Sequence, residues 1–382
     1  MLFSGGMVKG AMMAGLVAMA GVATAKTFVY VSNAEDGDLS TYTMQADGAL
    51  QAGPRVKVAG VVMPMTVSRD RKFLFAASRA KPFSVHTFAI DSGTGALTPS
   101  SVSPLAESFP YISLDKTGRY LFGAGYGANL ISVNAVGSDG RVSNDPLQVI
   151  PIGRNAHSIR VDESNRFVYV PSLGSDQVFQ FTFDAQTGRL ASNTPAVFLM
   201  KAQSGPRHFI TSADNKFLYL LTEFLATVTT FAIDSKTGLL TEVSTVSGMP
   251  PDSKLVPGAA RGAVGAPGGP PPRNTDNDIW AADIHMTPNG KLMYISERTS
   301  NSIAGFSVDA ATGKLTYLGS TATEKQPRGF AIDPTGKFMV VSGEKSDTVS
   351  TYAIDSANGS LKPVGRYPVG KGANWVEIVS FD

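Results

Sequence analysis

Ionisable side chains recur at two equivalent positions of a unit that repeats along this chain. One position begins the first predicted strand of the unit, and the other ends its second strand. Histidine, arginine and glutamate are residue types that hold anions and move protons in enzymes, so these positions are candidates for a chemical site. They are occupied by Arg79, His157, Arg207, Glu223, Arg298, Arg328 and Glu344, with His208 and His285 on first strands beside them.

The charge balance of this set favours a negatively charged ligand. Four arginines stand against two glutamates, which leaves positive potential at a concave, partly desolvated opening. Such potential suits a ligand anion or an oxyanion that develops during a reaction. The alternative, a solvated rim whose charges pair with one another, stays open at this point. The fourth histidine, His86, lies in a predicted third strand, where we expect a structural role.

The unit that positions these residues is a run of four short strands. Its clearest copy covers residues 204–246, where β-branched and aromatic runs are bounded by Asp, Asn, Lys and Gly. This pattern is typical of antiparallel hairpins. A basic residue that opens the second strand recurs at intervals of 46–50 residues, apart from one interval of 75. The marker stands at Lys72, Arg119, Arg166, Lys216, Lys291 and Lys337.

Repeats of this length and strand count predict a β-propeller, in which each unit forms one four-stranded antiparallel blade. Six complete blades can be read from the sequence. Residues 26–58 supply three further strands and residues 372–379 supply one, so we expect the two chain ends to pair and close a seventh blade. The predicted fold is therefore an all-β, seven-bladed propeller over residues 26–382, with the first strand of each blade lining the central channel.

Two segments depart from the repeat. Residues 1–25 combine the basic Lys9, an apolar run and the sequence Ala23-Thr24-Ala25, which predicts a Sec-type signal peptide cleaved before Lys26. We therefore expect a periplasmic protein without membrane attachment after cleavage. An uncleaved anchor is the alternative, although the apolar run is shorter than the ~20 residues that span a bilayer. The long interval holds a Pro/Gly-rich insertion at residues 250–280, which either covers the site or decorates the surface.

Composition excludes several classes of function. The net charge is +2 with no basic run, so we expect no nucleic-acid partner. The absence of cysteine excludes thiol catalysis, disulfides and c-type haem attachment. The three channel histidines fall on different blades and the rim carries only two carboxylates, so we predict neither a metal site nor a cofactor. Nothing in the sequence indicates an oligomeric state.

Four stretches of the repeat carry a family likeness: NAHSIRVDESNRFVYVPSLGSDQV, GPRHFITSADNKFLYLLTE, DIHMTPNGKLMYISERTSNSIAGF and PRGFAIDPTGKFMVVSGEKSDTV. They resemble the seven-bladed propeller lactonases, a family that includes bacterial 6-phosphogluconolactonases of the propeller type and the fungal carboxy-muconate lactonizing enzyme. The resemblance implies a site of His157, Arg207 and Glu223, with Arg298 as a further arginine. It departs at Asn155, where the family often has a second histidine.

The predicted function is hydrolysis of a small-molecule sugar lactone, of the gluconolactone or 6-phosphogluconolactone type. The arginines would stabilise the oxyanion, Glu223 would act as base and His157 as acid, with the reverse assignment of these two open. Export argues for an unphosphorylated substrate. Two alternatives remain, a non-catalytic propeller that binds a protein or envelope ligand, and a muconate-type cyclase. The residues expected to contact substrate are Arg298, His208, His285, Arg328 and Glu344.

Overall fold

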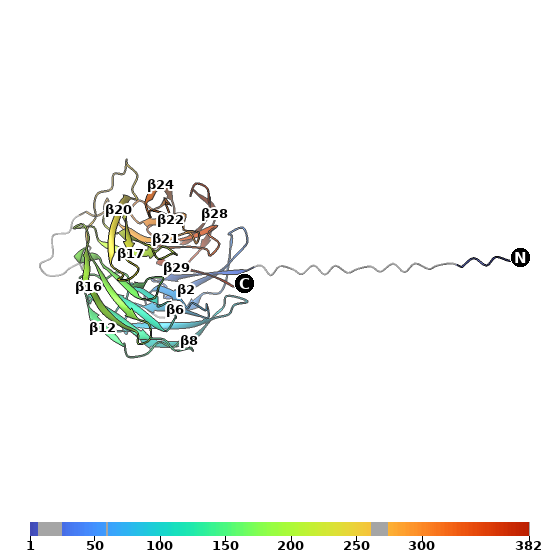
Figure 1. The fold of residues 1–382 in the computed structure, drawn as a ribbon, viewed down its shortest axis with the longest axis horizontal. Coiled ribbons are helices and arrows are strands. Elements are labelled where there is room, and N and C mark those ends of the chain that lie inside the picture. The colour runs from blue at the N-terminus through green and yellow to red at the C-terminus, as the bar shows by residue number, and fades with distance from the viewer. Residues whose placement is uncertain (7–24, 59, 261–273, 382) are drawn as a thin grey trace.

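The protein is described by a computed structural model that covers residues 1–6, 25–58, 60–260 and 274–381. Its strands form seven antiparallel blades arranged in a ring, which confirms the predicted seven-bladed propeller. Figure 1 shows the inner strands β17 (Pro206–Thr211), β21 (Ala281–Met286) and β29 (Ala373–Phe381) near the centre, and outer strands at the periphery.

Six blades are built from consecutive strands, each with its first strand innermost. The first three blades in chain order are β5 (Val62–Val67), β6 (Phe73–Ser78), β7 (Ser84–Ile90) and β8 (Leu97–Pro104); β9 (Tyr111–Leu114), β10 (Tyr120–Gly125), β11 (Leu130–Ala135) and β12 (Gln148–Pro151); and β13 (Arg160–Val161), β14 (Phe167–Ser172), β15 (Gln177–Asp184) and β16 (Arg189–Leu199). The next three blades are β17, β18 (Phe217–Thr222), β19 (Thr227–Ile233) and β20 (Leu240–Ser247); β21, β22 (Leu292–Glu297), β23 (Ser302–Val308) and β24 (Leu315–Ala322); and β25 (Pro327–Ile332), β26 (Phe338–Gly343), β27 (Thr348–Ile354) and β28 (Leu361–Pro368). A short 3₁₀ turn, η1 (Leu173–Ser175), follows β14.

The seventh blade joins the two ends of the chain. β29 is its inner strand and pairs antiparallel with β1 (Lys26–Asn33), from Lys26 opposite Phe381 to Ser32 opposite Trp375. The blade continues through β2 (Asp38–Met44) to β3 (Leu50–Ala52), and β4 (Val56–Lys57) pairs with the other end of β2. This pairing was predicted, and it removes the open sheet edges that a linear array would leave.

Repeated outer turns join several neighbouring blades. In the turn after β19, the carboxylate of Asp234 accepts hydrogen bonds from the backbone N–H groups of Lys236 and Thr237. Gly238 completes the turn at a φ of 71°, which a glycine adopts without steric cost. Its carbonyl accepts a 2.7 Å hydrogen bond from the Tyr169 hydroxyl of the preceding blade. Equivalent tyrosine–glycine bonds join Tyr30 to Gly95 and Tyr294 to Gly359.

The two segments that depart from the repeat are partly outside the described residues, namely 7–24 of the predicted signal peptide and 261–273 of the insertion. The described ends of the insertion connect β20 to β21. There Val256 forms a bridge with Asp278, and the Gly258 N–H donates to the Phe224 carbonyl at 2.8 Å. The insertion therefore leaves the ring beside Glu223, on the face where the sequence placed it. Within the described ranges, no helix has the length and apolar character to cross a membrane.

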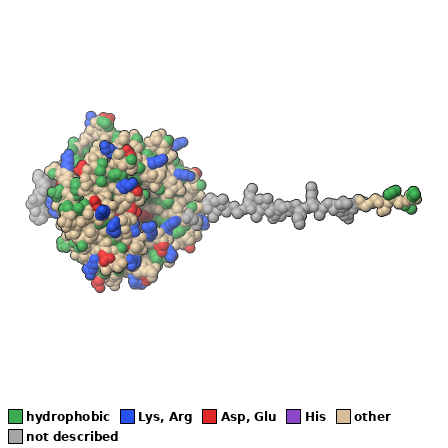
Figure 2. All heavy atoms as spheres, viewed as in Figure 1, with side chains coloured by type: hydrophobic (Ala, Val, Ile, Leu, Met, Phe, Trp, Pro, Cys, Tyr) green, Lys and Arg blue, Asp and Glu red, His purple; other side chains and the backbone are tan. Residues whose placement is uncertain are grey.

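The outer surface carries charges of both signs. On the face shown in Figure 2, acidic and basic side chains are interspersed rather than gathered into a patch of one sign. This distribution matches the small net charge of the whole chain.

The channel wall contains a partly buried carboxylate. Glu377 lies on β29 and accepts a 2.9 Å hydrogen bond from the indole N–H of Trp375. Burial raises the pKa of Glu377 to about 7, and the bond from Trp375 opposes part of that rise. The charged form of this side chain therefore weakens the fold at neutral pH.

We predict that Glu377→Gln makes the fold less sensitive to alkaline pH. The folded-state pKa of about 7 lies above the unfolded value, so stability from this group is complete below about pH 4.5 and is lost as the pH rises through 7. The wild type should lose on the order of 3 kcal/mol of unfolding free energy through this group, a loss that glutamine avoids. Denaturant titration at pH 5 and pH 8 measures the change in unfolding free energy of each protein, with the exposed Glu242→Gln as control. Equal pH slopes for wild type and Glu377→Gln would contradict the prediction.

Candidate active site

One mouth of the central channel collects the ionisable side chains that the repeat predicted. At this mouth the chain enters each first strand and leaves each second strand, because the two strands are antiparallel. The Glu223 N–H donates to the Gly205 carbonyl just before β17, and the Arg298 N–H donates to the Trp280 carbonyl just before β21. We call this opening the Glu223 mouth, defined by His157, Arg207, Glu223 and Arg298.

Glu223 is the centre of a hydrogen-bonded charge cluster at this mouth. Its Oε2 accepts a 2.7 Å bond from Arg207 Nε and a 3.1 Å contact from Arg298 Nη2. Its Oε1 accepts a 3.1 Å bond from the indole N–H of Trp280. The side chains of Arg207, Glu223 and Arg298 are 0%, 8% and 2% exposed. Charge-assisted bonds with this little exposure to water are strong and directional, so they position the cluster rigidly.

Both arginines stay protonated despite their burial. Burial lowers the pKa of Arg207 to about 10, with the nearby charge of Arg328 adding to the decrease. Burial lowers the pKa of Arg298 to about 9, and Glu223 opposes that decrease. Arg298 is also held by its neighbour, because its guanidinium lies 3.7 Å from the ring centroid of Trp280 and donates to the Trp280 carbonyl.

Arg207 has unused hydrogen-bonding capacity. Only its Nε is bonded to Glu223, and its Nη1 and Nη2 are buried with no hydrogen-bond partner among the described residues. Buried donors are nearly always satisfied in proteins, so such a pair requires an explanation. A planar guanidinium presents these two N–H groups side by side, in the geometry that receives an anionic or carbonyl oxygen.

His157 lies beside this guanidinium as a neutral base. Burial, followed by the charge of Arg207, holds the pKa of His157 well below its usual range. Its ring packs edge-on against Tyr126 at 5.6 Å and against His208 at 5.2 Å, measured between ring centroids. Nδ1 of His157 has no hydrogen-bond partner in the described part of the chain. The ring therefore brings an uncharged nitrogen to a positively charged site.

The remaining predicted rim residues lie at the same mouth. The Glu344 N–H donates to Gln326 and the Arg79 N–H to Val61, each just before an inner strand. Arg328 and Glu344 approach each other at 3.7 Å and are partly exposed. Burial lowers the pKa of Arg79 to about 10, and its Nε donates to Ser108. These groups surround the buried cluster with an excess of positive charge.

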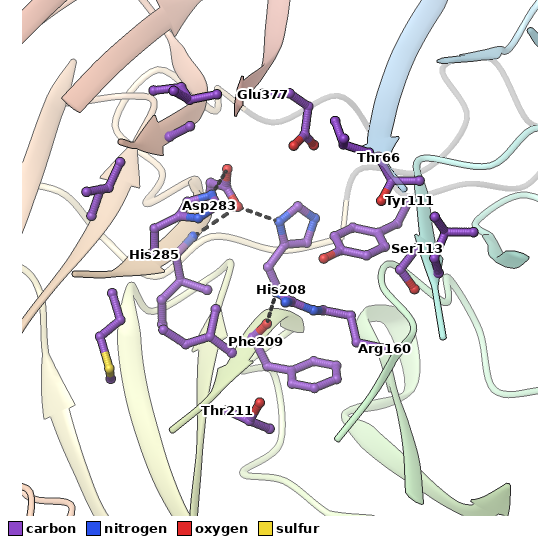
Figure 3. Close-up of a pocket in the computed structure, with 18 of the residues that line it drawn as sticks. Thr66, Tyr111, Ser113, Arg160, His208, Phe209, Thr211, Asp283, His285 and Glu377 are labelled. Carbon is purple, nitrogen blue, oxygen red and sulfur yellow. Dashed lines mark hydrogen bonds and ion pairs between the residues drawn. The ribbon is translucent and has the colours of Figure 1, made fainter. Parts of the chain in front are cut away.

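The structure does not bring His285 to the Glu223 mouth. Ala281 pairs with Glu297 at that mouth, whereas His285 pairs with Tyr294, four residues further along β21. At about 3.3 Å per residue this separation is about 13 Å along the channel. His285 instead lines a cavity at the opposite mouth (Figure 3). The inner-strand histidines were predicted to share one site because a position in the repeat does not give depth along the channel.

His208 lies between the two mouths rather than beside Glu223. Its ring contacts His157, but its Nδ1 is 2.9 Å from Asp283 Oδ1 and its ring lines the opposite cavity. The side chains predicted to bind one ligand therefore separate into two groups at the two ends of the channel.

Several residues of the channel were not predicted, among them Trp280 at the Glu223 mouth and Asp283. Trp280 ends the insertion and occupies the position just before the inner strand that Gly205 and Gln326 occupy in the neighbouring blades, where neither residue is ionisable. The sequence did contain an indication that Trp280 belongs to the channel, since it is one of only two tryptophans and directly precedes a predicted inner strand. Asp283 follows within β21 and was passed over because it matches neither marked position of the repeat.

Proteins similar to this chain extend over nearly its whole length. The family described as "Lactonase, 7-bladed beta-propeller" matches residues 18–378. The 6-phosphogluconolactonases of Pectobacterium carotovorum and Serratia proteamaculans are 34% and 36% identical over 354 and 355 residues. Each alignment covers 93% of this chain and 99% of the relative.

Solved structures agree with these sequence comparisons. The periplasmic gluconolactonase of Pseudomonas aeruginosa superposes with a TM-score of 0.79 at 25% identity, covering 93% of this chain and 99% of that one. A protein from Bacteroides fragilis superposes with a TM-score of 0.80 at 23% identity, covering 94% and 99%, a likeness that concerns the fold alone. The family match, the sequence relatives and the seven blades together show that this chain belongs to the seven-bladed β-propeller lactonase family.

Proposed function

We propose that this protein hydrolyses the lactone of a sugar acid at the Glu223 mouth and releases the open-chain aldonic acid. The observation that carries the proposal is the buried, protonated Arg207, whose Nη1 and Nη2 are unpartnered beside the neutral His157. The 6-phosphogluconolactonase and gluconolactonase relatives support the same reaction class.

Arg207 is the group we assign to the developing negative charge. When water attacks the lactone carbonyl, the carbonyl oxygen becomes an oxyanion, and donors already directed at it lower the barrier. The bond from Arg207 Nε to Glu223 Oε2 fixes the plane of the guanidinium, so Nη1 and Nη2 require no reorganisation during the reaction. Arg298 supplies a second fixed positive charge beside them.

His157 is the group we assign to proton transfer. Its neutral ring accepts a proton from the attacking water as the new C–O bond forms. The resulting imidazolium lies next to Arg207 in a buried setting that disfavours its charge, so it readily gives the proton to the ring oxygen as the acyl C–O bond breaks. His157 thus carries out both proton transfers of the hydrolysis, from the attacking water and to the leaving ring oxygen.

Glu223 is assigned to positioning rather than to proton transfer. Oε2 receives both arginines and Oε1 receives the indole N–H of Trp280, so both oxygens already have partners. A base needs an oxygen within reach of the water proton. We therefore depart from the sequence-based preference for Glu223 as base and favour His157 in that role.

We predict that His157→Ala lowers kcat for D-glucono-1,5-lactone by about 10²–10⁴-fold, because the proton carrier is lost. His86→Ala is the matched control, since His86 lies on β7 and bonds only to Ser84 in the described structure. Initial rates, corrected for spontaneous opening of the lactone, measure the effect. The wild-type profile should also lack an inflection near pH 6.5, because the pKa of His157 is lowered. Wild-type turnover by His157→Ala would contradict the assignment.

We further propose that the substrate is unphosphorylated and that the protein acts in the periplasm. The signal-like residues 1–25 support export, and the periplasmic gluconolactonase of Pseudomonas aeruginosa supports this choice among the named relatives. A phosphorylated sugar lactone is a cytoplasmic metabolite, so an exported enzyme would not meet it.

We predict a higher kcat/KM for glucono-1,5-lactone than for its 6-phosphate. The same protein expressed with residues 1–25 should be recovered from the periplasmic fraction with Lys26 as its first residue, as read by intact mass. Deletion of residues 2–25 is the control and should leave the protein in the cytoplasm. A preference for the 6-phosphate, or full-length protein in the cytoplasm, would contradict the assignment.

A further inference from the structure

We infer that the channel mouth opposite Glu223 holds a second ligand site, for a neutral polyhydroxylated molecule about the size of a monosaccharide. We call it the Asp283 cavity, defined by Tyr111, Arg160, His208, Asp283, His285 and Glu377. This inference does not depend on the proposed function, because the side-chain hydrogen bonds of Asp283, His208, His285 and Glu377 are made with residues other than Glu223 and Arg207.

The cavity has the size and position of a small-molecule site. Its volume is about 580 Å³, within the range of roughly 300–1,000 Å³ that ligand pockets occupy. It opens between the turns that connect first and second strands, at Lys116 and Gly290 among others. Ring contacts lie between it and the Glu223 mouth, since His208 packs against His157 at 5.2 Å and against Tyr111 at 4.9 Å.

Asp283 fixes the orientation of two imidazoles in this cavity. Its Oδ1 is 2.9 Å from His208 Nδ1, and its Oδ2 is 3.1 Å from His285 Nε2. Burial acts to raise the pKa of Asp283, but His285 and the hydrogen bond from His208 outweigh burial and hold it well below its usual range. Burial lowers the pKa of His208 to about 3, so a neutral ring donates to an ionised carboxylate.

This tautomer leaves a hydrogen-bond acceptor without a partner. Because His208 Nδ1 carries the proton, its Nε2 has a free lone pair. Nε2 is buried and has no hydrogen-bond partner among the described residues, while the whole side chain is 5% exposed. Figure 3 shows the ring of His208 projecting into the cavity between Asp283 and Tyr111, with Glu377 across from it. A ligand hydroxyl placed there would satisfy this nitrogen.

Donors face the same space. Arg160 bonds to the Phe209 carbonyl through Nη1 and reaches the cavity from β13, and the phenol of Tyr111 enters from β9. Glu377 accepts from Trp375 through Oε1, and its Oε2 has no hydrogen bond to another residue of the described ranges, so this oxygen remains for a ligand. Each hydroxyl of a polyol both donates and accepts, so it matches a wall that mixes donors and acceptors over short distances.

The charge balance favours a neutral ligand. The basic side chains that line the cavity are Arg69, Lys116 and Arg160, and the acidic ones are Asp115, Glu163, Asp283 and Glu377. Lys116 and Glu163 also pair with each other at 2.6 Å. Positive and negative side chains are thus nearly equal in number in the Asp283 cavity, whereas arginines exceed carboxylates at the Glu223 mouth. An anion therefore gains little electrostatic stabilisation in the Asp283 cavity.

The two tryptophans of the chain allow the two mouths to be observed separately. Trp375 lines the Asp283 cavity, whereas Trp280 bonds to Glu223 at the other mouth. Trp280→Phe therefore leaves a fluorescent reporter at the Asp283 cavity, and Trp375→Phe leaves one at the Glu223 mouth. D-glucose is the neutral probe, and D-gluconate is the anionic probe of similar size.

Glucose should change the emission of the Trp280→Phe protein in a saturable manner, with weaker binding of gluconate and no change in the Trp375→Phe protein. Adding His208→Phe to Trp280→Phe should weaken glucose binding about tenfold or more, the effect expected for loss of one buried hydrogen bond. Isothermal titration of wild-type protein with glucose keeps the test valid if a variant fails to fold. No binding of glucose to the wild type, tighter binding of gluconate than of glucose in the Trp280→Phe protein as read by Trp375 emission, or a glucose signal from Trp280 alone would overturn the inference.

Discussion

The bond between Arg207 Nε and Glu223 Oε2 is the interaction on which the rest of the site depends. It joins the start of β17 to the end of β18, and Glu223 then holds Arg298 from the next blade and Trp280 from the end of the insertion. Loss of one partner would leave a charge buried without compensation, which typically costs about 3–5 kcal/mol. The same bond fixes the guanidinium plane, so stability and the proposed chemistry rest on one contact.

The propeller makes this contact possible by bringing distant segments to one axis. The pairing of β1 with β29 closes the ring, and the tyrosine–glycine bonds between blades hold neighbouring repeats in register. Inner strands from different blades then present their first residues at one mouth and their last residues at the other. Two sites with different electrostatics can therefore share one channel, separated by the contact between His157 and His208.

Much of this arrangement could be predicted from the sequence, because a repeat assigns equivalent positions to residues far apart. The basic marker and the outer turns gave the number of blades, and the alignment of Glu223 with Arg298 placed both at one mouth. Trp280 could not be found in this way, since the equivalent positions of neighbouring blades hold Gly205 and Gln326, which are not ionisable. Its bond to Glu223 is a feature of tertiary structure that periodicity does not encode.

The repeat also does not predict where His208 and His285 lie in the channel. The pairing of β17 with β18 shifts register between Pro206 and Phe209. Within this irregular stretch Arg207 bonds to Glu223 of its own blade, while His208 bonds to Asp283 of the next blade. β21 has the same shift between Ala281 and Ile284, around Asp283 itself. A pattern read with period two cannot locate such a shift.

The central claim is that the two free nitrogens of Arg207 stabilise the oxyanion, and Arg207→Lys tests it most directly. Lysine keeps the positive charge for Glu223 but lacks the fork of parallel N–H donors. Measured beside the exposed Arg189→Lys as control, kcat for glucono-1,5-lactone should fall about 10²-fold or more while the protein remains folded. Unchanged kcat in a folded Arg207→Lys protein would contradict the account.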